Sequence, residues 1–265
     1  MTLYFKKPIV MGILNLTPDS FYDGVKDLDL ISLEKKVKKN KYADIIDVGA
    51  ESTRPFSDSI TSEEEIERLS IFMDIKDSIK QKLSIDSYKY DVIKYALDNG
   101  FNIINDISGG GDKNCNIGLA AEYGVPIIIM HMQGNPRTMQ IKPKYDNLID
   151  DILFFFNSKI KIMKNEFDLS DEQIIIDPGI GFGKSIQDNY SIIDNIYRFK
   201  DLGFPLLIGL SRKSFLSIDG DLPQERKKAS LQMQSIAMYN GADYIRTHDV
   251  YDTYQSVRII DRFKK

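Results

Sequence analysis

The sequence contains few of the residues on which disulfides, zinc sites and thiol chemistry depend. Cys115 is the only cysteine, and His131 and His248 are the only histidines, among 265 residues. One cysteine excludes an internal disulfide, and such sparse use is typical of a reducing compartment. The same scarcity leaves no cysteine–histidine spacing for zinc. We therefore expect a cytoplasmic protein without a structural zinc ion.

Long apolar runs and a positive charge balance are also missing. The longest apolar runs, around residues 125–130 and 152–156, are far shorter than the roughly twenty residues of a membrane helix. The first residues lack the apolar core of a signal peptide. Lys and Arg total 35 against 39 Asp and Glu, so the net charge of −4 gives no broad attraction for nucleic acid. We expect neither a membrane nor a nucleic acid as partner.

Short apolar runs alternate regularly with segments of helical spacing. The runs are rich in Ile and Val and mostly do not alternate with polar residues, as expected of parallel strands covered on both faces. They comprise residues 9–14, 43–48, 82–86, 102–107, 125–130, 174–177, 205–210 and 243–246. Glycine precedes four of them, where a helix C-cap needs a left-handed residue. These are Gly100, Gly124, Gly203 and Gly241.

Eight such units without a composition break predict one domain over residues 1–265, a single (β/α)8 TIM barrel of the α/β class. The alternative is a doubly wound open sheet, which usually has fewer strands and an interpretable nucleotide turn. Ser62 with Glu65, and Asp188, are the expected N-terminal signals of two helices. The longest connections, residues 17–29, 50–61 and 132–145, fall on the C-terminal face, where barrel active sites are built.

The segment after the sixth run looks at first like a nucleotide loop. Residues 174–185 read Ile-Ile-Ile-Asp-Pro-Gly-Ile-Gly-Phe-Gly-Lys-Ser. A Walker loop requires four residues between its first glycine and Gly-Lys-Ser, whereas three separate Gly179 from Gly183. The dinucleotide fingerprint has a different glycine spacing too. What remains is an acid, Asp177, at the end of a buried strand, beside a turn that lets a ligand approach the backbone.

Polar side chains stand at the end of nearly every predicted strand. Each alone is an ordinary turn former, but together they converge on one concavity if the barrel closes. The residues at or just after the strand ends are Asn15, Asp47, Asp86, Asn105, Asp106, Met130, His131, Asp177, Lys213, Arg246 and His248. Buried carboxylates need a ligand or a cationic partner, and a carboxylate can accept two parallel hydrogen bonds from a flat heterocycle. The basic segments 211–213 and 246–248 lie in the quadrant where barrels often bind phosphate. A Schiff-base role for Lys213 is the alternative to anion or ring binding.

Seven motifs occur in order along the chain, at residues 11–21, 51–55, 84–87, 104–107, 177–184, 209–214 and 246–250. Together they resemble the dihydropteroate synthase family. The resemblance implies a TIM barrel that joins 6-hydroxymethyl-7,8-dihydropterin diphosphate to 4-aminobenzoate, releasing pyrophosphate and giving dihydropteroate for folate synthesis. It also implies a Mg²⁺ cofactor and a homodimer formed through C-terminal helices.

The resemblance assigns a role to each matching position. The pterin ring would be held by Asp86, Asn105 and Asp177, with Met130, Gly209, Lys213 and Arg246 completing its slot. Asn15, Thr53, Arg246 and His248 would hold the diphosphate, with Asn15 as a Mg²⁺ ligand. Thr53, Arg54 and Pro55 would frame the 4-aminobenzoate together with Phe182 and Ser211. The expected catalytic residues are Asp86, Lys213, Arg246 and His248.

Two alternatives stay open on the sequence alone. Methyltetrahydrofolate-dependent methyltransferases have a pterin-binding barrel with comparable acid and amide positions, although the segments 17–21 and 52–55 speak against them. The other alternative is a pterin-binding protein that has lost its chemistry, although no matched position carries an inert replacement. For the reaction itself we favour a dissociative substitution at the pterin methylene, with Asp86 near the developing positive charge.

Overall fold

Eight strands alternate with helices along the chain, as the apolar runs predict. The computed structural model describes residues 7–17, 30–52, 59–134, 138–139, 143–217, 220, 222 and 224–263. The strands are β1 (Ile9–Asn15), β2 (Ile45–Gly49), β3 (Lys82–Asp86), β4 (Ile103–Asp106), β5 (Ile127–Met130), β6 (Ile174–Asp177), β7 (Leu207–Ile208) and β8 (Tyr244–Thr247). The α-helices within these ranges are α1 (Leu30–Lys39), α2 (Ser62–Lys76), α3 (Tyr90–Asp98), α4 (Cys115–Tyr123), α5 (Leu148–Asn165), α6 (Ile186–Asp194), α7 (Ile196–Lys200), α8 (Lys227–Asn240) and α9 (Val250–Phe263).

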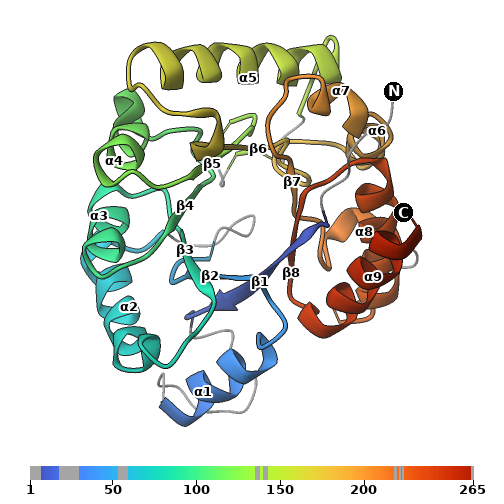
Figure 1. The fold of residues 1–265 in the computed structure, drawn as a ribbon. Helices are drawn as coiled ribbons and strands as arrows, with labels where there is room; N and C mark the ends of the chain where they lie inside the picture. Colours follow the sequence, from blue (N-terminus) through green and yellow to red (C-terminus); the bar gives the residue numbers. More distant parts are fainter. Residues whose placement is uncertain are drawn as a thin grey trace.

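The strands close into a parallel barrel. They are hydrogen-bonded in the order β6-β5-β4-β3-β2-β1-β8-β7. A parallel bridge between Ile176 and Leu206 joins β6 to β7 and completes the circle. Figure 1 shows the strands in the middle and the helices around them. The predicted (β/α)8 TIM barrel is confirmed, and the open-sheet alternative is excluded.

The start of α2 shows where the sequence signal was ambiguous. Thr61 caps this helix: its Oγ1 accepts a hydrogen bond from the Glu64 N–H at 3.2 Å, and Glu64 Oε2 accepts one from the Thr61 N–H at 3.0 Å. The predicted pair, Ser62 with Glu65, is therefore wrong by one residue. Glu65 turns inward instead, where its buried carboxylate lies 2.9 Å from Lys89 Nζ.

The other predicted helix signals are confirmed. Asp188 takes part in a capping box with Ser185 at the start of α6. Glycines follow four of the helices with positive φ values: Gly100 at 85°, Gly124 at 64°, Gly203 at 86° and Gly241 at 121°. Within the described ranges, no helix has both the length and the apolar character that are needed to cross a bilayer.

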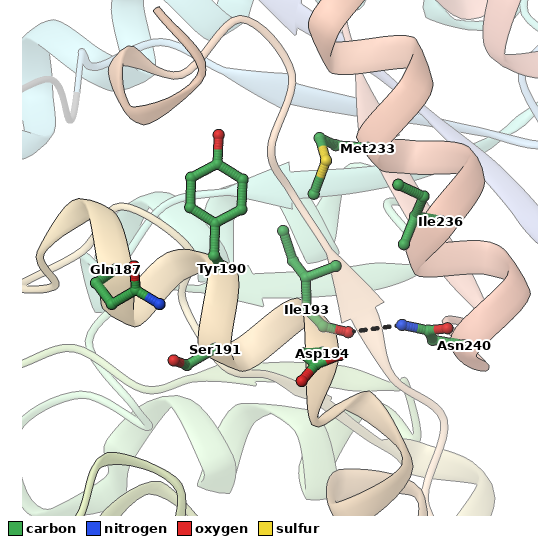
Figure 2. Close-up of a pocket in the computed structure, with 8 residues that line it drawn as sticks. All are labelled: Gln187, Tyr190, Ser191, Ile193, Asp194, Met233, Ile236 and Asn240. Atoms are coloured by element: carbon green, nitrogen blue, oxygen red, sulfur yellow. Dashed lines mark hydrogen bonds between the residues drawn. The ribbon is translucent and has the colours of Figure 1, made fainter.

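A groove runs between α6 and α8 on the outside of the barrel. Tyr190 and Ile193 of α6 face Met233 and Ile236 of α8 across it (Figure 2). Asn240 Nδ2 closes one end of the groove by donating to the Ile193 carbonyl at 2.9 Å. The groove lies in the helical layer, separate from the mouth of the barrel.

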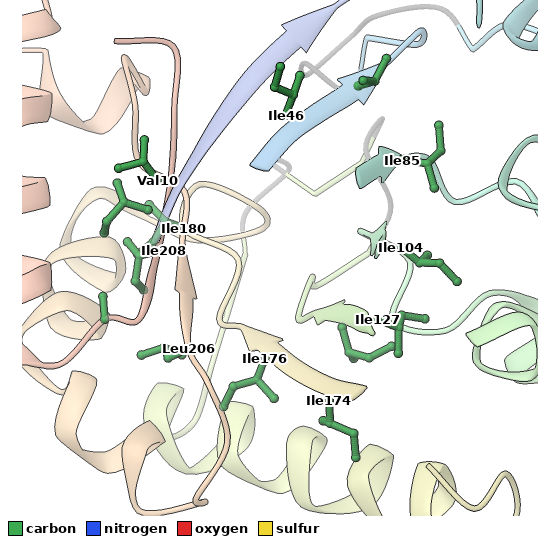
Figure 3. Packing of buried hydrophobic residues seen from close by; sticks show 14 of the residues in the cluster. Val10, Ile46, Ile85, Ile104, Ile127, Ile174, Ile176, Ile180, Leu206 and Ile208 are labelled. Carbon is green, nitrogen blue, oxygen red and sulfur yellow. The ribbon is translucent and has the colours of Figure 1, made fainter. Parts of the chain in front are cut away.

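The strands carry apolar side chains on both faces. The outward-facing set, including Ile46, Ile104 and Ile176, packs against the helices (Figure 3). A second cluster fills the barrel interior and comprises Met11, Ile45, Ile103, Ile128, Ile175 and Leu207. Since side chains alternate along a strand, the residues two positions further on point into the barrel one layer closer to its C-terminal mouth. Those residues include Asp47, Asn105, Met130, Asp177 and Gly209. The polar side chains among them therefore lie directly above the interior cluster, which we call the apolar floor.

Candidate active site

Arg246 of β8 lies at the centre of the barrel mouth, between two carboxylates. Its Nε donates to Asp47 Oδ2 at 2.6 Å, and its Nη2 donates to Asp86 Oδ2. The Asp47 side chain is fully buried, whereas that of Asp86 is 13% exposed. Burial alone would lower the pKa of Arg246, but Asp86 and Asp47 raise it above its ordinary value. The cationic partner that buried acids require is therefore this guanidinium. Gly209 lies beside it, since a Cβ there would be at van der Waals distance, 3.7 Å, from Arg246 Cβ.

The pKa of Asp86 lies near neutral pH. Burial raises the pKa of its carboxyl to about 7, although Arg246 opposes the rise, and Asp47 adds to it. Gly49 of β2 lies close by, since a Cβ at that position would be 3.3 Å from Asp86 Oδ2. A ligand that donates N–H groups to this carboxyl would favour its charged form.

Asn105 of β4 is buried beside the two acids. Its Nδ2 donates to Asp47 Oδ2 at 2.9 Å, and strand register places its backbone opposite Asp86. One carboxylate oxygen of Asp47 therefore accepts hydrogen bonds from both Asn105 and Arg246. The three strands β2, β4 and β8 are linked through that single atom.

Asp177 closes the opposite side of the mouth. Its Oδ1 accepts a hydrogen bond from the Gly179 N–H at 2.8 Å. Burial raises the pKa of this carboxyl, while Lys213 opposes the rise. Met130, its register partner on β5, is buried alongside it. Gly179 has φ +70°, and a Cβ there would lie only 2.0 Å from the His131 carbonyl oxygen, so this turn requires glycine.

Lys213 and Phe182 form a wall next to Asp177. Lys213 Nζ donates to the Ile180 carbonyl and lies 4.6 Å from the centre of the Phe182 ring. Burial lowers the pKa of Lys213 to about 8, and the negative charge of Asp177 opposes that fall. The amine is held close to a carboxylate and an aromatic face, an arrangement suited to binding a flat polar ring.

Lys184, which gave the turn its likeness to a nucleotide loop, is buried beneath that turn. Its Nζ donates to the Phe182 carbonyl at 2.9 Å and to the His131 carbonyl at 3.3 Å, and lies 3.1 Å from His131 Nδ1. Burial lowers the pKa of Lys184 to about 7. Burial, with help from the neighbouring Lys184, lowers the pKa of His131 to about 3. The ammonium joins two backbone segments, which agrees with the spacing that excludes a Walker loop.

The basic segments after β7 and β8 are hydrogen-bonded to each other, and their polar side chains have different partners. His248 is exposed at the mouth, and its backbone N–H donates to Ser211 Oγ at 3.2 Å. Arg212 is instead bound to Asp249, with Nε and Nη2 donating to its two oxygens at 3.0 and 2.6 Å. Within the segment 211–213, Arg212 is therefore engaged in an ion pair with an acid of the protein itself.

Asn15 ends β1 at the edge of the mouth and is half-buried. Its backbone carbonyl accepts a hydrogen bond from Lys36 Nζ at 3.1 Å, and its register partner is Gly49, which lies against Asp86. In the part of the chain that the structure describes, no group of three or more His, Cys, Asp or Glu side chains could hold a metal ion. Thr53, Arg54 and Pro55 lie outside the described residues.

Asp47 is the member of the cluster whose importance the sequence did not reveal. It stands at a strand end like its neighbours, but nothing in the chain order links it to Arg246, which is 199 residues away. A usable signal was its position two residues after Ile45, an inward-facing residue of the apolar floor.

The chain is similar to known proteins over nearly its whole length. A family model described as Pterin binding enzyme matches residues 11–248. The dihydropteroate synthase of Escherichia coli strain K12 is 39% identical over 270 residues, which cover 98% of this chain and 93% of that protein. The structure of the Yersinia pestis dihydropteroate synthase with a sulfonamide drug complex has a TM-score of 0.90 at 35% identity, covering 97% of this chain and 94% of that one. The Xanthomonas albilineans dihydropteroate synthase in complex with 7,8-dihydropteroate has a TM-score of 0.87 at 29% identity, covering 98% and 94%.

Proposed function

This chain belongs to the dihydropteroate synthase family of pterin-binding enzymes, and we propose how the residues at its barrel mouth share the work of that enzyme. It is a transferase that joins 6-hydroxymethyl-7,8-dihydropterin diphosphate to 4-aminobenzoate, releasing pyrophosphate and giving 7,8-dihydropteroate in folate biosynthesis. One observation carries the assignment of roles: a guanidinium lies between two carboxylates, directly above an apolar floor.

The pterin ring binds in the slot between Asp86, Asn105 and Asp177. Their oxygens are acceptors, and a pterin presents several N–H donors along one edge. The ring faces would contact Met130 and the backbone at Gly209, while Lys213 donates to a ring acceptor. Asn105 and Asp177 are buried and the Asp86 side chain is only 13% exposed, which supports this role, because N–H donors from a ligand would satisfy carboxylates that are otherwise costly to bury.

The 4-aminobenzoate lies nearer the surface, between Phe182 and Ser211 on one side and the segment Thr53, Arg54 and Pro55 on the other. Phe182 offers an aromatic edge or face to the benzoate ring. Arg54 would pair with its carboxylate, for which a guanidinium is well shaped. This arrangement directs the amine toward the pterin methylene.

We assign the diphosphate to Arg246 and His248, together with Thr53, and Asn15 would hold a Mg²⁺ ion beside it. The donor set fits Mg²⁺, because this ion commonly takes one or two protein oxygens and completes its shell with substrate phosphates and water. When bound, it would neutralise negative charge on the diphosphate. Arg246 faces the same charge and also stacks against the pterin ring.

The substitution breaks the bond between the methylene carbon and the diphosphate oxygen, and the electron pair leaves with the diphosphate. The amine nitrogen of 4-aminobenzoate then forms the new C–N bond and loses one proton. We favour bond breaking before bond making, since the electron-rich dihydropterin can spread the positive charge and the carboxylate of Asp86 can stabilise it. Crystals soaked with pterin diphosphate alone should then show cleavage; an intact diphosphate until 4-aminobenzoate is added would contradict this order.

Pyrophosphate release on mixing the two substrates is the direct test of the reaction. Sustained release over many turnovers should require both compounds and Mg²⁺, and 7,8-dihydropteroate should form in equal amount. A protein that only binds pterins would release none. A methyltetrahydrofolate-dependent methyltransferase would also release none, and would turn over a methyl donor instead.

A homodimer is supported by exposed apolar side chains on the outer helices. Tyr190 and Ile236 line the groove of Figure 2 and are 39% and 47% exposed. Tyr239 of α8 and Phe263 of α9 are 55% and 71% exposed, with their ring centres 5.8 Å apart. Apolar patches of this kind mark contact surfaces, and a twofold dimer would use the same patch on both copies. Sedimentation should give a dimer, and Ile236→Lys should give a monomer. We place the enzyme in the cytoplasm, in keeping with its single cysteine.

A further inference from the structure

The buried carboxylate of Asp47 has no substrate to bind, yet it touches two groups that do. Its side chain is fully buried, so no ligand atom can reach it. Its Oδ2 accepts from Arg246 Nε at 2.6 Å and from Asn105 Nδ2 at 2.9 Å. Its Oδ1 is buried with no hydrogen-bond partner among the described residues. An orphaned buried oxygen is unfavourable, so packing alone does not account for an acid here.

The carboxylate determines which way the amide of Asn105 faces. A carboxylate only accepts hydrogen bonds, so the amide must turn its Nδ2 toward Asp47. Asn105 Oδ1 is then the group that remains for a ligand, as an acceptor. A neutral amide at position 47 would accommodate either orientation of Asn105 and would lose this selection.

The same carboxylate holds Arg246 by the end that a ligand does not contact. Nε is bound to the buried Asp47, whereas Nη2 is bound to Asp86, which is partly exposed at the mouth. When a ring N–H engages Asp86, the hydrogen bond from Nη2 has to be shared or released. The hydrogen bond from Nε is unaffected, so the guanidinium stays in place as the diphosphate departs.

We propose that Asp47 is a positioning residue for the condensation, which fixes the Arg246 guanidinium and the Asn105 amide while Asp86 and Asp177 bind the pterin. This inference rests on the proposed roles of Arg246 and Asn105. The reaction and its substrates are those of the proposed function. The new element is the carboxylate of Asp47, which acts only through its two neighbours.

Asp47→Asn tests the proposal, because it keeps the side-chain shape and removes the charge. We expect kcat to fall about 10- to 100-fold, the effect of weakening one charge-assisted hydrogen bond, with the KM for pterin diphosphate changed by less than about 3-fold. In an Arg246→Gln background the same substitution should add less than about 2-fold, because the two residues act as a unit. Ser84→Ala is the matched control: Ser84 is the register partner of Asp47, it is buried, and its Oγ also has no partner among the described residues. It should leave kcat unchanged.

Two results would overturn the inference: a kcat for Asp47→Asn no lower than that of Ser84→Ala, or effects of Asp47→Asn and Arg246→Gln that multiply. If the Asp47→Asn variant does not fold, hydrogen exchange in the wild-type enzyme tests the same proposal. The Arg246 Nε–H resonance, identified by its absence in Arg246→Gln, should exchange slowly and stay protected when pterin diphosphate is added without 4-aminobenzoate. Faster exchange of this proton when pterin diphosphate is added would refute the proposal that Asp47 fixes Arg246. Full activity in both Arg246→Gln and Asn105→Ala would instead refute the proposed site roles.

Discussion

Replacing Gly179 with alanine tests how tightly the turn after β6 is packed on β5. At φ +70° an alanine is strained by about 1–2 kcal/mol. The added Cβ would also lie 2.0 Å from the His131 carbonyl oxygen, a backbone atom that cannot swing away. Relieving that overlap requires the turn and the end of β5 to separate, which costs about 1–3 kcal/mol more. We expect Gly179→Ala to lower the free energy of unfolding by about 2–5 kcal/mol in urea denaturation.

Gly124→Ala is the matched control for this experiment. Gly124 has a similar φ of +64°, but a Cβ there would meet no atom within 4 Å, so it should cost only the backbone strain of about 1–2 kcal/mol. The two variants should also differ in binding. Separation of the turn removes the Gly179 N–H from Asp177 Oδ1, so pterin affinity should fall in Gly179→Ala alone. Equal losses of stability in the two variants would refute the packing argument.

The remaining predictions concern the ligand slots and one buried lysine. Asp177→Ala should abolish pterin binding in calorimetry, and an unchanged affinity would contradict its assignment as the pterin acceptor. Phe182→Ala should raise the KM for 4-aminobenzoate about 5- to 20-fold, because about 1–2 kcal/mol of ring contact is lost, with little change in the KM for pterin diphosphate. Burial lowers the pKa of Lys184 from 10.5 to about 7, so in that window the unfolded chain binds more protons there and stability should rise with pH. Lys184→Met should remove up to about 1.4 kcal/mol per pH unit of this slope in urea denaturation at about pH 7.5–9.5; identical slopes would count against the lowered pKa of Lys184.

The strands and the ring of polar residues could be predicted because both depend on local pattern. Runs such as Ile174–Asp177 are apolar up to their last residue, and turn residues follow them. Once these runs are taken as parallel barrel strands, their last residues have to meet at one mouth. Asp86, Asn105, Asp177 and Arg246 were selected in this way, and all four lie there.

What the sequence could not predict depends on choices between near-equivalent partners. Thr61 and Ser62 can both cap a helix, and Glu64 and Glu65 both lie at a suitable distance; only burial of Glu65 against Lys89 decides between them. For the same reason, the sequence does not show which basic side chains bind a ligand and which are paired with acids of the protein. Arg212 is bound by an acid 37 residues away, a pairing that no local pattern contains.

The position of the Arg246 pair with Asp47 and Asp86 also constrains the order in which the barrel can be completed. The two acids precede their guanidinium by 199 and 160 residues, so a growing chain makes both long before β8 exists. Until β8 docks between β1 and β7, closing the earlier strands would bury two negative charges without a counter-ion, which is strongly unfavourable. The last strand therefore neutralises the interior as it fills the gap. Compaction of an incomplete barrel is therefore opposed by Asp86, which we assign to the substrate, and by Asp47, which holds Arg246 and Asn105.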